Sequence, residues 1–398
     1  MPTDHIRTQR LRQSSILLAA LVATVPCAHG ARAGQNDLLV GIDGKTFFDA
    51  EGMRYGPGGH DSLAIVDITN PAHPSIRASL PLANTVLGPP TNLQITPNGA
   101  LGLLASSVVH VQKGDTWAPE PDDKLYVIDL AANPPALAGT VTVGKQPSGL
   151  AISPDGKLAL VANRAGKSVS VLAIDGKTVR AVGEVAIGDE VAAVLFMPDG
   201  HRAFVAKNTT NRVGVLAVDG QTVTYDKSLD IPMGGLGVYN LDGTPNGDYV
   251  LAANTGVGAG NADTITVIDA KAQPPRAIYH VSVGDGPEGF AISPDGKWAA
   301  TPLLMGSSAA HNHWGYHQNG STVLLDLGKP EQPVVVNAAP SGGVPEGIAW
   351  SPDSQYLYVG NYTDNNLQVY RVVDGKLTDT GVKLALGGQP ASVRGVAR

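Results

Sequence analysis

Two glutamates occupy matching places in two copies of a repeated phrase, residues 286–289 (Gly-Pro-Glu-Gly) and 344–347 (Val-Pro-Glu-Gly). Other copies of this phrase carry small or aromatic residues there, such as Ser148 and Tyr239. Paired carboxyl groups can act as general acid and base, and carboxylates also bind divalent metals. Glu288 and Glu346 are therefore the first candidates for a site. The structural alternative is that they only accept hydrogen bonds from loop N–H groups.

Residues 311–317 (His-Asn-His-Trp-Gly-Tyr-His) hold three of the ten histidines of the chain. Neutral imidazoles and carboxylates bind zinc, copper or iron, and a site with an open position can activate water. His311 and His313 alternate as in an extended strand, so both could point the same way. We therefore predict a divalent metal held by His311, His313 and His317 as one possibility. The plainer interpretation is a loop whose rings pack over the fold, and the spacing matches no known metal motif.

A Pro-Asp-Gly-like turn recurs along the chain at intervals of about 43 to 58 residues, which is the range of propeller and solenoid repeats. Pro and Gly favour a tight turn between two strands, and the Asp between them is a common turn residue. We therefore assign the recurring aspartates to the fold and not to a site. The turns lie at residues 96–99, 153–156, 197–200, 244–247, 293–296 and 351–354.

Each repeat predicts four antiparallel strands, with the tight turn between the first and the second. Six units begin near Gly88, Gln146, Glu190, Gly237, Gly286 and Val344. Residues 34–87 lack a first strand, and residues 389–393 supply one because they copy the start of the unit at Gln146. The predicted fold is an all-β, seven-bladed β-propeller, closed by pairing of the N- and C-terminal strands. Eight blades are the main alternative.

The phrases at residues 146–157 and 356–362 resemble those of the YVTN-repeat β-propellers, a family related to the lactonase-type seven-bladed propellers. The resemblance covers residues 34–398 and implies a secreted seven-bladed propeller. It implies no catalytic residues, because this family includes binding proteins, enzymes and enzyme subunits.

Residues 1–33 have the order of a secretory signal peptide: arginines, an apolar stretch over residues 16–25, and Ala31-Arg32-Ala33 as a cleavage site. The apolar stretch is shorter than the roughly 20 residues of a membrane-spanning helix. We expect a mature chain of residues 34–398 without a transmembrane segment, located in the periplasm or secreted. The only cysteine, Cys27, lies in the segment removed, which excludes disulfides and cysteine ligands from the mature chain.

The formal net charge is −7, and it is about −10 without residues 1–33, which hold four Arg and one Asp. A chain this acidic lacks the basic surface of a nucleic-acid-binding protein, so we expect no nucleic-acid partner.

In a propeller, the loops before each first strand and those between second and third strands lie on one face, around the mouth of the central channel. Three of these loops are predicted to be long, at residues 46–61, 106–123 and 303–320, and long loops are often functional. The predicted ligand-binding residues on this face are Glu288, Glu346, Tyr239, Ser148, Asn163, Lys207, Asn361, His60 and Trp314.

Three functions agree with these patterns. The favoured one is a binding module of the cell envelope that holds a small molecule or a partner protein at the channel mouth. The second is a metal-assisted hydrolase that resembles the lactonases, and the third is a subunit of a periplasmic redox enzyme.

Overall fold

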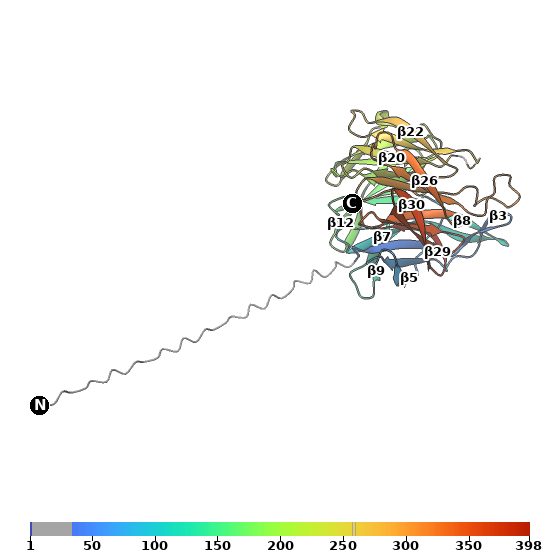
Figure 1. Ribbon diagram of the computed structural model, residues 1–398, viewed down its shortest axis with the longest axis horizontal. Coiled ribbons are helices and arrows are strands. Elements are labelled where there is room, and N and C mark those ends of the chain that lie inside the picture. The colour runs from blue at the N-terminus through green and yellow to red at the C-terminus, as the bar shows by residue number, and fades with distance from the viewer. Residues whose placement is uncertain (2–33, 257, 259) are drawn as a thin grey trace. The chain divides into compact units, whose positions relative to one another are not determined.

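The computed structural model describes Met1 and residues 34–256, 258 and 260–398. The predicted signal peptide therefore lies, apart from Met1, outside the described residues. In the described part of the chain, no helix has the length and apolar character needed to cross a membrane. The described residues from Gly34 onward form seven blades of four antiparallel strands, one of which carries a fifth short strand, and this confirms the predicted seven-bladed propeller (Figure 1).

The first strand of each blade is the inner one, and the chain runs outward from it. Blade 1 is β31 (Gln389–Arg394), β1 (Asp37–Asp43), β4 (Ser62–Asp67) and β5 (Ser75–Leu80). Blade 2 is β6 (Leu93–Ile95), β7 (Leu101–Lys113), β8 (Thr116–Asp129) and β9 (Ala136–Thr142). Blade 3 is β10 (Pro147–Ile152), β11 (Leu158–Asn163), β12 (Ser168–Asp175) and β13 (Thr178–Ala186).

Blade 4 is β14 (Val191–Phe196), β15 (Arg202–Lys207), β16 (Arg212–Asp219) and β17 (Thr222–Tyr225), with β18 (Ile231–Pro232) also on β16. Blade 5 is β19 (Val238–Gly243), β20 (Tyr249–Asn254), β21 (Asp263–Asp269) and β22 (Arg276–Gly284). Blade 6 is β23 (Ala291–Ile292), β24 (Trp298–Leu303), β25 (Ser321–Asp326) and β26 (Val334–Pro340). Blade 7 is β27 (Pro345–Trp350), β28 (Tyr356–Asn361), β29 (Asn366–Val373) and β30 (Lys376–Ala385).

The two ends of the described propeller share blade 1, as predicted. β31 pairs antiparallel with β1, and Val393 lies opposite Val40 in the register. Both side chains are fully buried, in a cluster that joins blades 1 and 7. The ring is therefore closed by backbone hydrogen bonds and by apolar packing at the same place.

The core of the protein lies between neighbouring blades. In blade 3 every residue of β11 is buried, whereas the outer strand β13 is largely exposed. A cluster between blades 3 and 4 contains Leu160, Phe196 and Val205. Inner and middle strands are thus apolar on both faces because each blade is covered by two neighbours.

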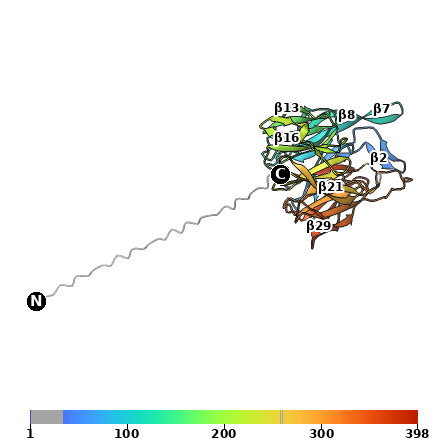
Figure 2. The same cartoon turned by 90° about the horizontal axis from the view of Figure 1, so that it is seen from above.

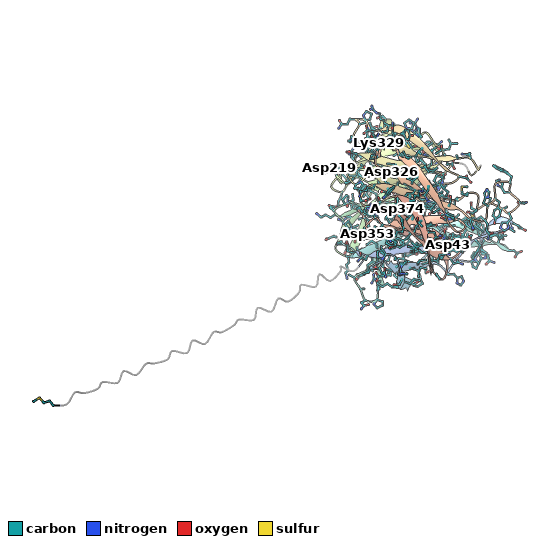
Figure 3. The ribbon with its side chains drawn as sticks, in the orientation of Figure 1. Asp43, Asp219, Asp326, Lys329, Asp353 and Asp374 are labelled. Atoms are coloured by element: carbon teal, nitrogen blue, oxygen red, sulfur yellow. The ribbon has the colours of Figure 1, made fainter. Side chains whose placement is uncertain are left out.

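The recurring turn is closed by side-chain hydrogen bonds. In blade 3, Ser153 Oγ donates to Asp155 Oδ1 at 2.6 Å and accepts from the N–H of Leu158 at 2.9 Å. Gly156 has a φ of 72°, a left-handed value that favours glycine. Asp353, labelled in Figure 3, has the same role in blade 7, where it accepts from Ser351 Oγ at 2.5 Å and from the N–H of Gln355 at 3.0 Å. The turn aspartates are therefore structural.

Two of the three expected long loops are strands instead. β7 and β8 stay paired through most of residues 106–123, with a β-bulge between Ser106 and Val108, and end at the pair Lys113 and Thr116 with the two-residue turn Gly114-Asp115 between them. β2 (Thr46–Asp49) and β3 (Gly52–Tyr55) form a second hairpin within residues 46–61. The expectation was wrong because Gly-Asp between alternating residues is a hairpin turn.

Candidate functional site

Glu288 and Glu346 lie together at the start of the inner strands of blades 6 and 7. Glu346 is the second residue of β27, and Pro287, just before Glu288, forms a bridge with Leu303 of β24. The two carboxyl groups are hydrogen-bonded to each other. Glu346 is 3% exposed, and Glu288 is partly buried. The repeat therefore brings the two candidate carboxyls of adjacent blades into direct contact.

The glycine after each glutamate permits this contact. A Cβ at Gly289 would collide with the backbone oxygen of Glu346, and a Cβ at Gly347 would collide with the backbone of Val393. Glycine therefore lets the inner strands of neighbouring blades approach closely at this level of the channel. The Pro-Glu-Gly sequence both places a carboxyl group and draws the next blade toward it.

Burial raises the pKa of Glu288 to about 7, although the hydrogen bond from Glu346 and the positive charge of Arg164 oppose the rise. The pKa of Glu346 is raised well above its usual range, first by burial and then by the nearby charge of Glu288. Because the two groups interact, they titrate as a pair that holds one proton near neutral pH. One carboxylate and one carboxylic acid then lie side by side.

Arg164 and Tyr239 complete the polar part of the site. The guanidinium of Arg164 lies 5.7 Å from the ring centroid of Tyr239, and its Nη2 donates to Asn208 Oδ1 at 3.3 Å. Its Nε is 3.5 Å from a carboxylate oxygen of Glu190. Burial, followed by the charge of Glu288, raises the pKa of Tyr239, so its hydroxyl stays protonated and can donate a hydrogen bond.

A cavity of about 430 Å³ opens beside these groups. One wall comes from Phe48 and Met53 of the β2–β3 hairpin, and another from Val108 of the extended β7. The remaining lining residues are Val86, Leu87, Gly88, Pro119, Pro121, Gln146, Arg164, Tyr239, Glu288, Leu304, Ser308 and Glu346. The cavity thus combines apolar walls with a convergent set of polar groups, as small-molecule sites do.

The three insertions around the mouth contact one another. Ala50, at the tip of the β2–β3 hairpin, accepts a hydrogen bond from the N–H of His311 at 2.9 Å. At the other edge, the ring of Tyr55 meets that of His110 edge-on, at a centroid distance of 5.2 Å. In Figures 1 and 2, β2, β3 and β8 lie at one side of the propeller. The hairpin therefore bridges the extended strands of blade 2 and the loop of blade 6.

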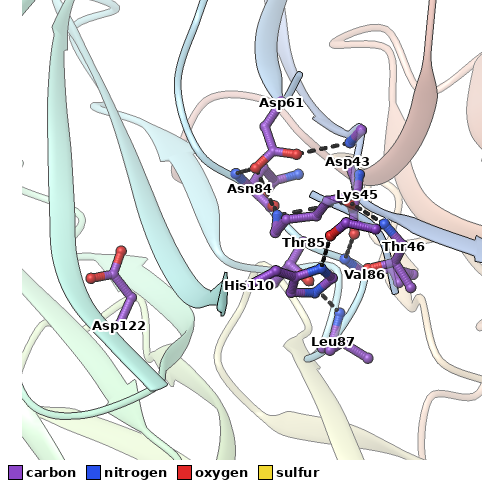
Figure 4. A network of polar contacts seen from close by, with 12 residues as sticks. Asp43, Lys45, Thr46, Asp61, Asn84, Thr85, Val86, Leu87, His110 and Asp122 are labelled. Atoms are coloured by element: carbon purple, nitrogen blue, oxygen red, sulfur yellow. Dashed lines mark hydrogen bonds and ion pairs between the residues drawn. The ribbon is translucent and has the colours of Figure 1, made fainter. Parts of the chain in front are cut away.

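A buried ion network holds the base of this hairpin (Figure 4). Lys45 Nζ donates to Asp61 Oδ2 at 2.7 Å and to the backbone oxygen of Asn84. Asp43 accepts from the N–H groups of Thr46 at 3.0 Å and Val86 at 2.9 Å. The network therefore fixes both the start of β2 and the segment that carries Val86 into the cavity wall.

Four of the predicted ligand-binding residues make internal hydrogen bonds and do not line this cavity. Asn163 donates to Ser168 and Ser170, and Asn361 bonds Asn366 and Gln368. Lys207 is bound to Asp230 at 2.5 Å and Tyr225 at 3.0 Å, and Ser148 to Gln146 and Ser107. All four side chains are buried. These contacts give them structural roles in their blades.

The histidine-rich loop of blade 6 is a series of turns and not an extended strand, so the expected alternation of His311 and His313 does not occur. The ring of His311 packs on Tyr316 at 4.3 Å, and His313 packs near Trp314 at 5.7 Å. Trp314 is 78% exposed. Packing of rings is thus the observed arrangement of this loop, while metal binding stays a prediction.

Among the residues that the structure describes, no group of three or more His, Cys, Asp or Glu is arranged to hold a metal ion. His60 is exposed at the end of the β3–β4 connection, and His317 is exposed in the loop of blade 6. Any metal bound by His311, His313 and His317 would therefore require that loop to rearrange.

Arg164, which follows the buried Asn163 at the end of β11, is a site residue that the sequence did not predict. Its position matches that of Asn208 and Tyr362 in other blades, and its charge is the one signal that singles it out. Nothing in the sequence marks Phe48 and Met53 as site residues, because only the fold of the β2–β3 hairpin brings them to the cavity.

Residues 124–236 match the model of the seven-bladed β-propeller lactonase family. Antigen Lp49 of Leptospira interrogans is 30% identical over 158 residues, which are 35% of this chain and 32% of that protein. The matched region thus spans about a third of this relative. Glu288 and Glu346 lie outside the residues that match the family model, and Arg164 lies inside them.

Two solved structures cover nearly the whole propeller. Pseudomonas aeruginosa periplasmic gluconolactonase, PpgL, has a TM-score of 0.65 at 16% identity, over 91% of this chain and 99% of that chain. A Bacteroides uniformis protein provisionally assigned as a 6-phosphogluconolactonase has a TM-score of 0.68 at 17% identity, over 90% and 99%. At these identities the likeness shows the fold. This chain is therefore a seven-bladed propeller whose residues 124–236 are similar to the lactonase family, while the YVTN assignment stays a prediction.

Proposed function

We propose that the protein hydrolyses a small lactone in the cavity at the channel mouth, with Glu288 and Glu346 as the base and acid. The observation that carries this proposal is the buried pair of carboxyl groups that shares one proton beside a cavity of about 430 Å³. The likeness to lactonase-type propellers supports the choice of a cyclic ester.

The residues can divide the reaction between them. Glu288, as the carboxylate, takes a proton from water as its oxygen bonds to the lactone carbonyl carbon. The Tyr239 hydroxyl and the Arg164 guanidinium are donors for the negative oxygen that forms. The ring C–O bond then breaks, and the leaving oxygen receives the proton of Glu346. The product is a hydroxy acid, and proton exchange with solvent restores the pair.

The direct test follows hydrolysis of glucono-δ-lactone above its spontaneous rate in purified protein. We expect Glu288→Gln and Glu346→Gln each to lower kcat by about 100-fold or more, the usual contribution of acid–base catalysis. Glu331→Gln is the matched control, because Glu331 lies in the turn between β25 and β26. Activity that survives both substitutions would rule out this mechanism.

The pH profile checks the same assignment. The base form of Glu288 is populated as the pH rises through about 7, so kcat/KM should rise across this range. It should fall again at higher pH, where Glu346 loses its proton. A profile that is flat apart from hydroxide catalysis would contradict a shared-proton pair.

The binding module remains a second proposal for the same cavity. The apolar walls formed by Phe48, Met53, Val108 and Leu304 favour it, because they can bury a ligand whether or not it reacts. Saturable binding of the lactone without turnover would support this role and refute the hydrolase. The envelope location and the redox-subunit alternative stay proposals, and cell fractionation and co-purification test them.

The metal-assisted form of the hydrolase is tested separately, by metal analysis of untagged protein. Stoichiometric zinc, copper or iron that is lost in a His311→Ala/His313→Ala variant would support it. Equal activity before and after treatment with a chelator would favour the carboxyl pair alone.

A further inference from the structure

The opposite end of the channel holds a second cavity, of about 300 Å³. Its lining includes Pro294 and Pro352 of the recurring turns, which follow the inner strands. The inner strands therefore separate it from the glutamate pair. Phe196, Phe290 and Trp350 form apolar walls. The proposed hydrolysis makes no use of this cavity.

Arg394, the last residue of β31, lines the cavity and carries a charge without a close counter-ion. Its Nη1 donates to the backbone oxygen of Leu150 at 2.8 Å, and this hydrogen bond joins blade 1 to blade 3. Among the described residues, no carboxylate lies within 4.0 Å of this guanidinium. Burial lowers the pKa of Arg394 to about 10, with Asp242 opposing and Arg398 adding to the shift. The half-buried guanidinium has no ion-pair partner within this cavity, and binding of an anion would offset the cost of its partial desolvation.

The carboxylates of this cavity already have partners. Asp37 forms an ion pair with Arg77. Asp242 Oδ2 accepts from the N–H of Ile292 at 2.8 Å and lies 3.4 Å from Arg398. Neither is within ion-pair distance of Arg394, so the cavity keeps one positive group that its own side chains do not neutralise.

Gln94 supplies a second, oriented donor. Its Oε1 accepts from the N–H of Ile152 at 2.9 Å, which fixes which end of the amide faces the neighbouring strand. The side chain is 7% exposed and lines the same cavity. Its Nε2 group forms no hydrogen bond to another described residue and is available to a bound ligand.

We propose that the cavity lined by Arg394 and Gln94 binds a small organic carboxylate. The flat guanidinium matches a carboxylate with two parallel hydrogen bonds, which favours a planar anion. Aromatic walls from Phe196, Phe290 and Trp350 suit an apolar body, and the volume suits a ligand with one ring. This binding site is independent of catalysis at the other end of the channel.

Benzoate is the probe. Benzamide has the same shape without the charge, and inorganic phosphate is an anion without an apolar ring, so these two compounds are the controls. Binding is measured by calorimetry and by the fluorescence of Trp350, which lines the cavity. We expect benzoate to bind at least about tenfold more tightly than benzamide or phosphate, because only benzoate satisfies both the charge and the walls. Equal binding of benzoate and benzamide, or no benzoate binding up to about 10 mM, would overturn the proposal.

The variants assign the binding to these residues. Arg394→Gln should weaken benzoate binding by roughly 10- to 100-fold, the value of a charged hydrogen bond. Arg202→Gln is the control and should leave benzoate binding unchanged. Arg202 Nη1 also donates to a backbone oxygen, that of Ala270 at 2.6 Å, but Arg202 does not line the cavity. Gln94→Glu keeps an acceptor for Ile152 and brings a carboxylate into the cavity, so it should abolish binding even if Arg394→Gln does not fold. Unchanged affinity in either cavity variant would refute the assignment.

Discussion

The chemistry of the candidate active site depends on two glutamates that are ordinary members of a structural repeat. Each follows a proline at the start of a blade, and each precedes a glycine that admits the next strand. Burial of both carboxyls in contact means that the second proton is hard to remove, because two adjacent charges repel. The pair therefore stores one proton at a pH where isolated glutamates store none.

This storage has a consequence for stability. The pKa of Glu288 rises from its ordinary value of 4.5 to about 7, so the folded protein binds more protons than the unfolded chain in this range. The stabilising contribution is complete below about pH 4.5 and is lost as the pH rises through about 7. We expect the stability of the wild type to fall between about pH 5 and pH 8 relative to a Glu288→Gln/Glu346→Gln variant, by at least about 3 kcal/mol from Glu288, with Glu346 adding to the fall in the same direction.

Urea unfolding at several pH values measures this difference, because all other groups titrate alike in the two proteins. The Glu331→Gln variant, changed at the turn between β25 and β26, should follow the wild type. Parallel pH profiles for the wild type and the double variant would show that the carboxyls titrate normally.

The sequence predicts where a residue lies in the ring better than it predicts which side chains that residue contacts. The repeat alone places Glu288 and Glu346 at neighbouring blades, because equivalent residues of a ring meet at its axis. Arg164 could not be predicted, since its contact with Tyr239 joins blades 3 and 5 across the mouth. The histidines were misplaced because a strand was assumed where Gly315 and its neighbours form turns.

At the scale of elements, the insertions shape the site and are held from below. Lys45 is 1% exposed and pairs with Asp61 and Asp43, and these acids also bind the backbone of the cavity wall. Removing one partner of a buried ion pair leaves the other charge uncompensated. The hairpin and the wall should therefore loosen together when this network is broken.

Lys45→Met is expected to lower the free energy of unfolding by about 3 to 5 kcal/mol, because two buried carboxylates lose their cation. Lys113→Met is the matched control at the exposed end of β7, where Lys113 pairs with Glu120 at 3.0 Å. It should cost less than about 1 kcal/mol. Similar urea midpoints for the two variants would mean that the buried network contributes no more than a surface pair.

The elements differ in how well the sequence predicts them. The four strands of each blade follow from alternating apolar residues and from the Pro-Asp-Gly turn, which acts within a few residues. The extended ribbon of β7 and β8 was missed because its outer half, apart from Val108 and His110, is mostly exposed or half-buried and lacks the continuous buried run of a strand inside the ring. The turn residues Gly114-Asp115 were the one local feature of the sequence that indicated this hairpin.

At the scale of the whole molecule, the ring depends on the inner strand that the C-terminal part of the chain supplies. β31 pairs with β1 and packs against β27, and its residues from Pro390 to Val393 are all buried. Without β31, β1 becomes an open edge and the inner face of blade 7 is exposed to water. Both effects expose apolar surface and unpaired backbone groups together.

We expect a chain that ends at Gly388 to lose cooperative thermal unfolding and to aggregate, because stacked blades stabilise one another only in a closed ring. The control is a circular permutant that begins at Lys145 and joins Arg398 to Asp37 by a flexible linker. It keeps β31 beside β1 and opens the chain between blades 2 and 3 instead, so it should unfold as one unit. Scanning calorimetry compares the truncated chain, the permutant and the full chain. If the truncated chain melted at the temperature of the full chain, closure by β31 would be dispensable, and contacts between neighbouring blades alone would hold the ring.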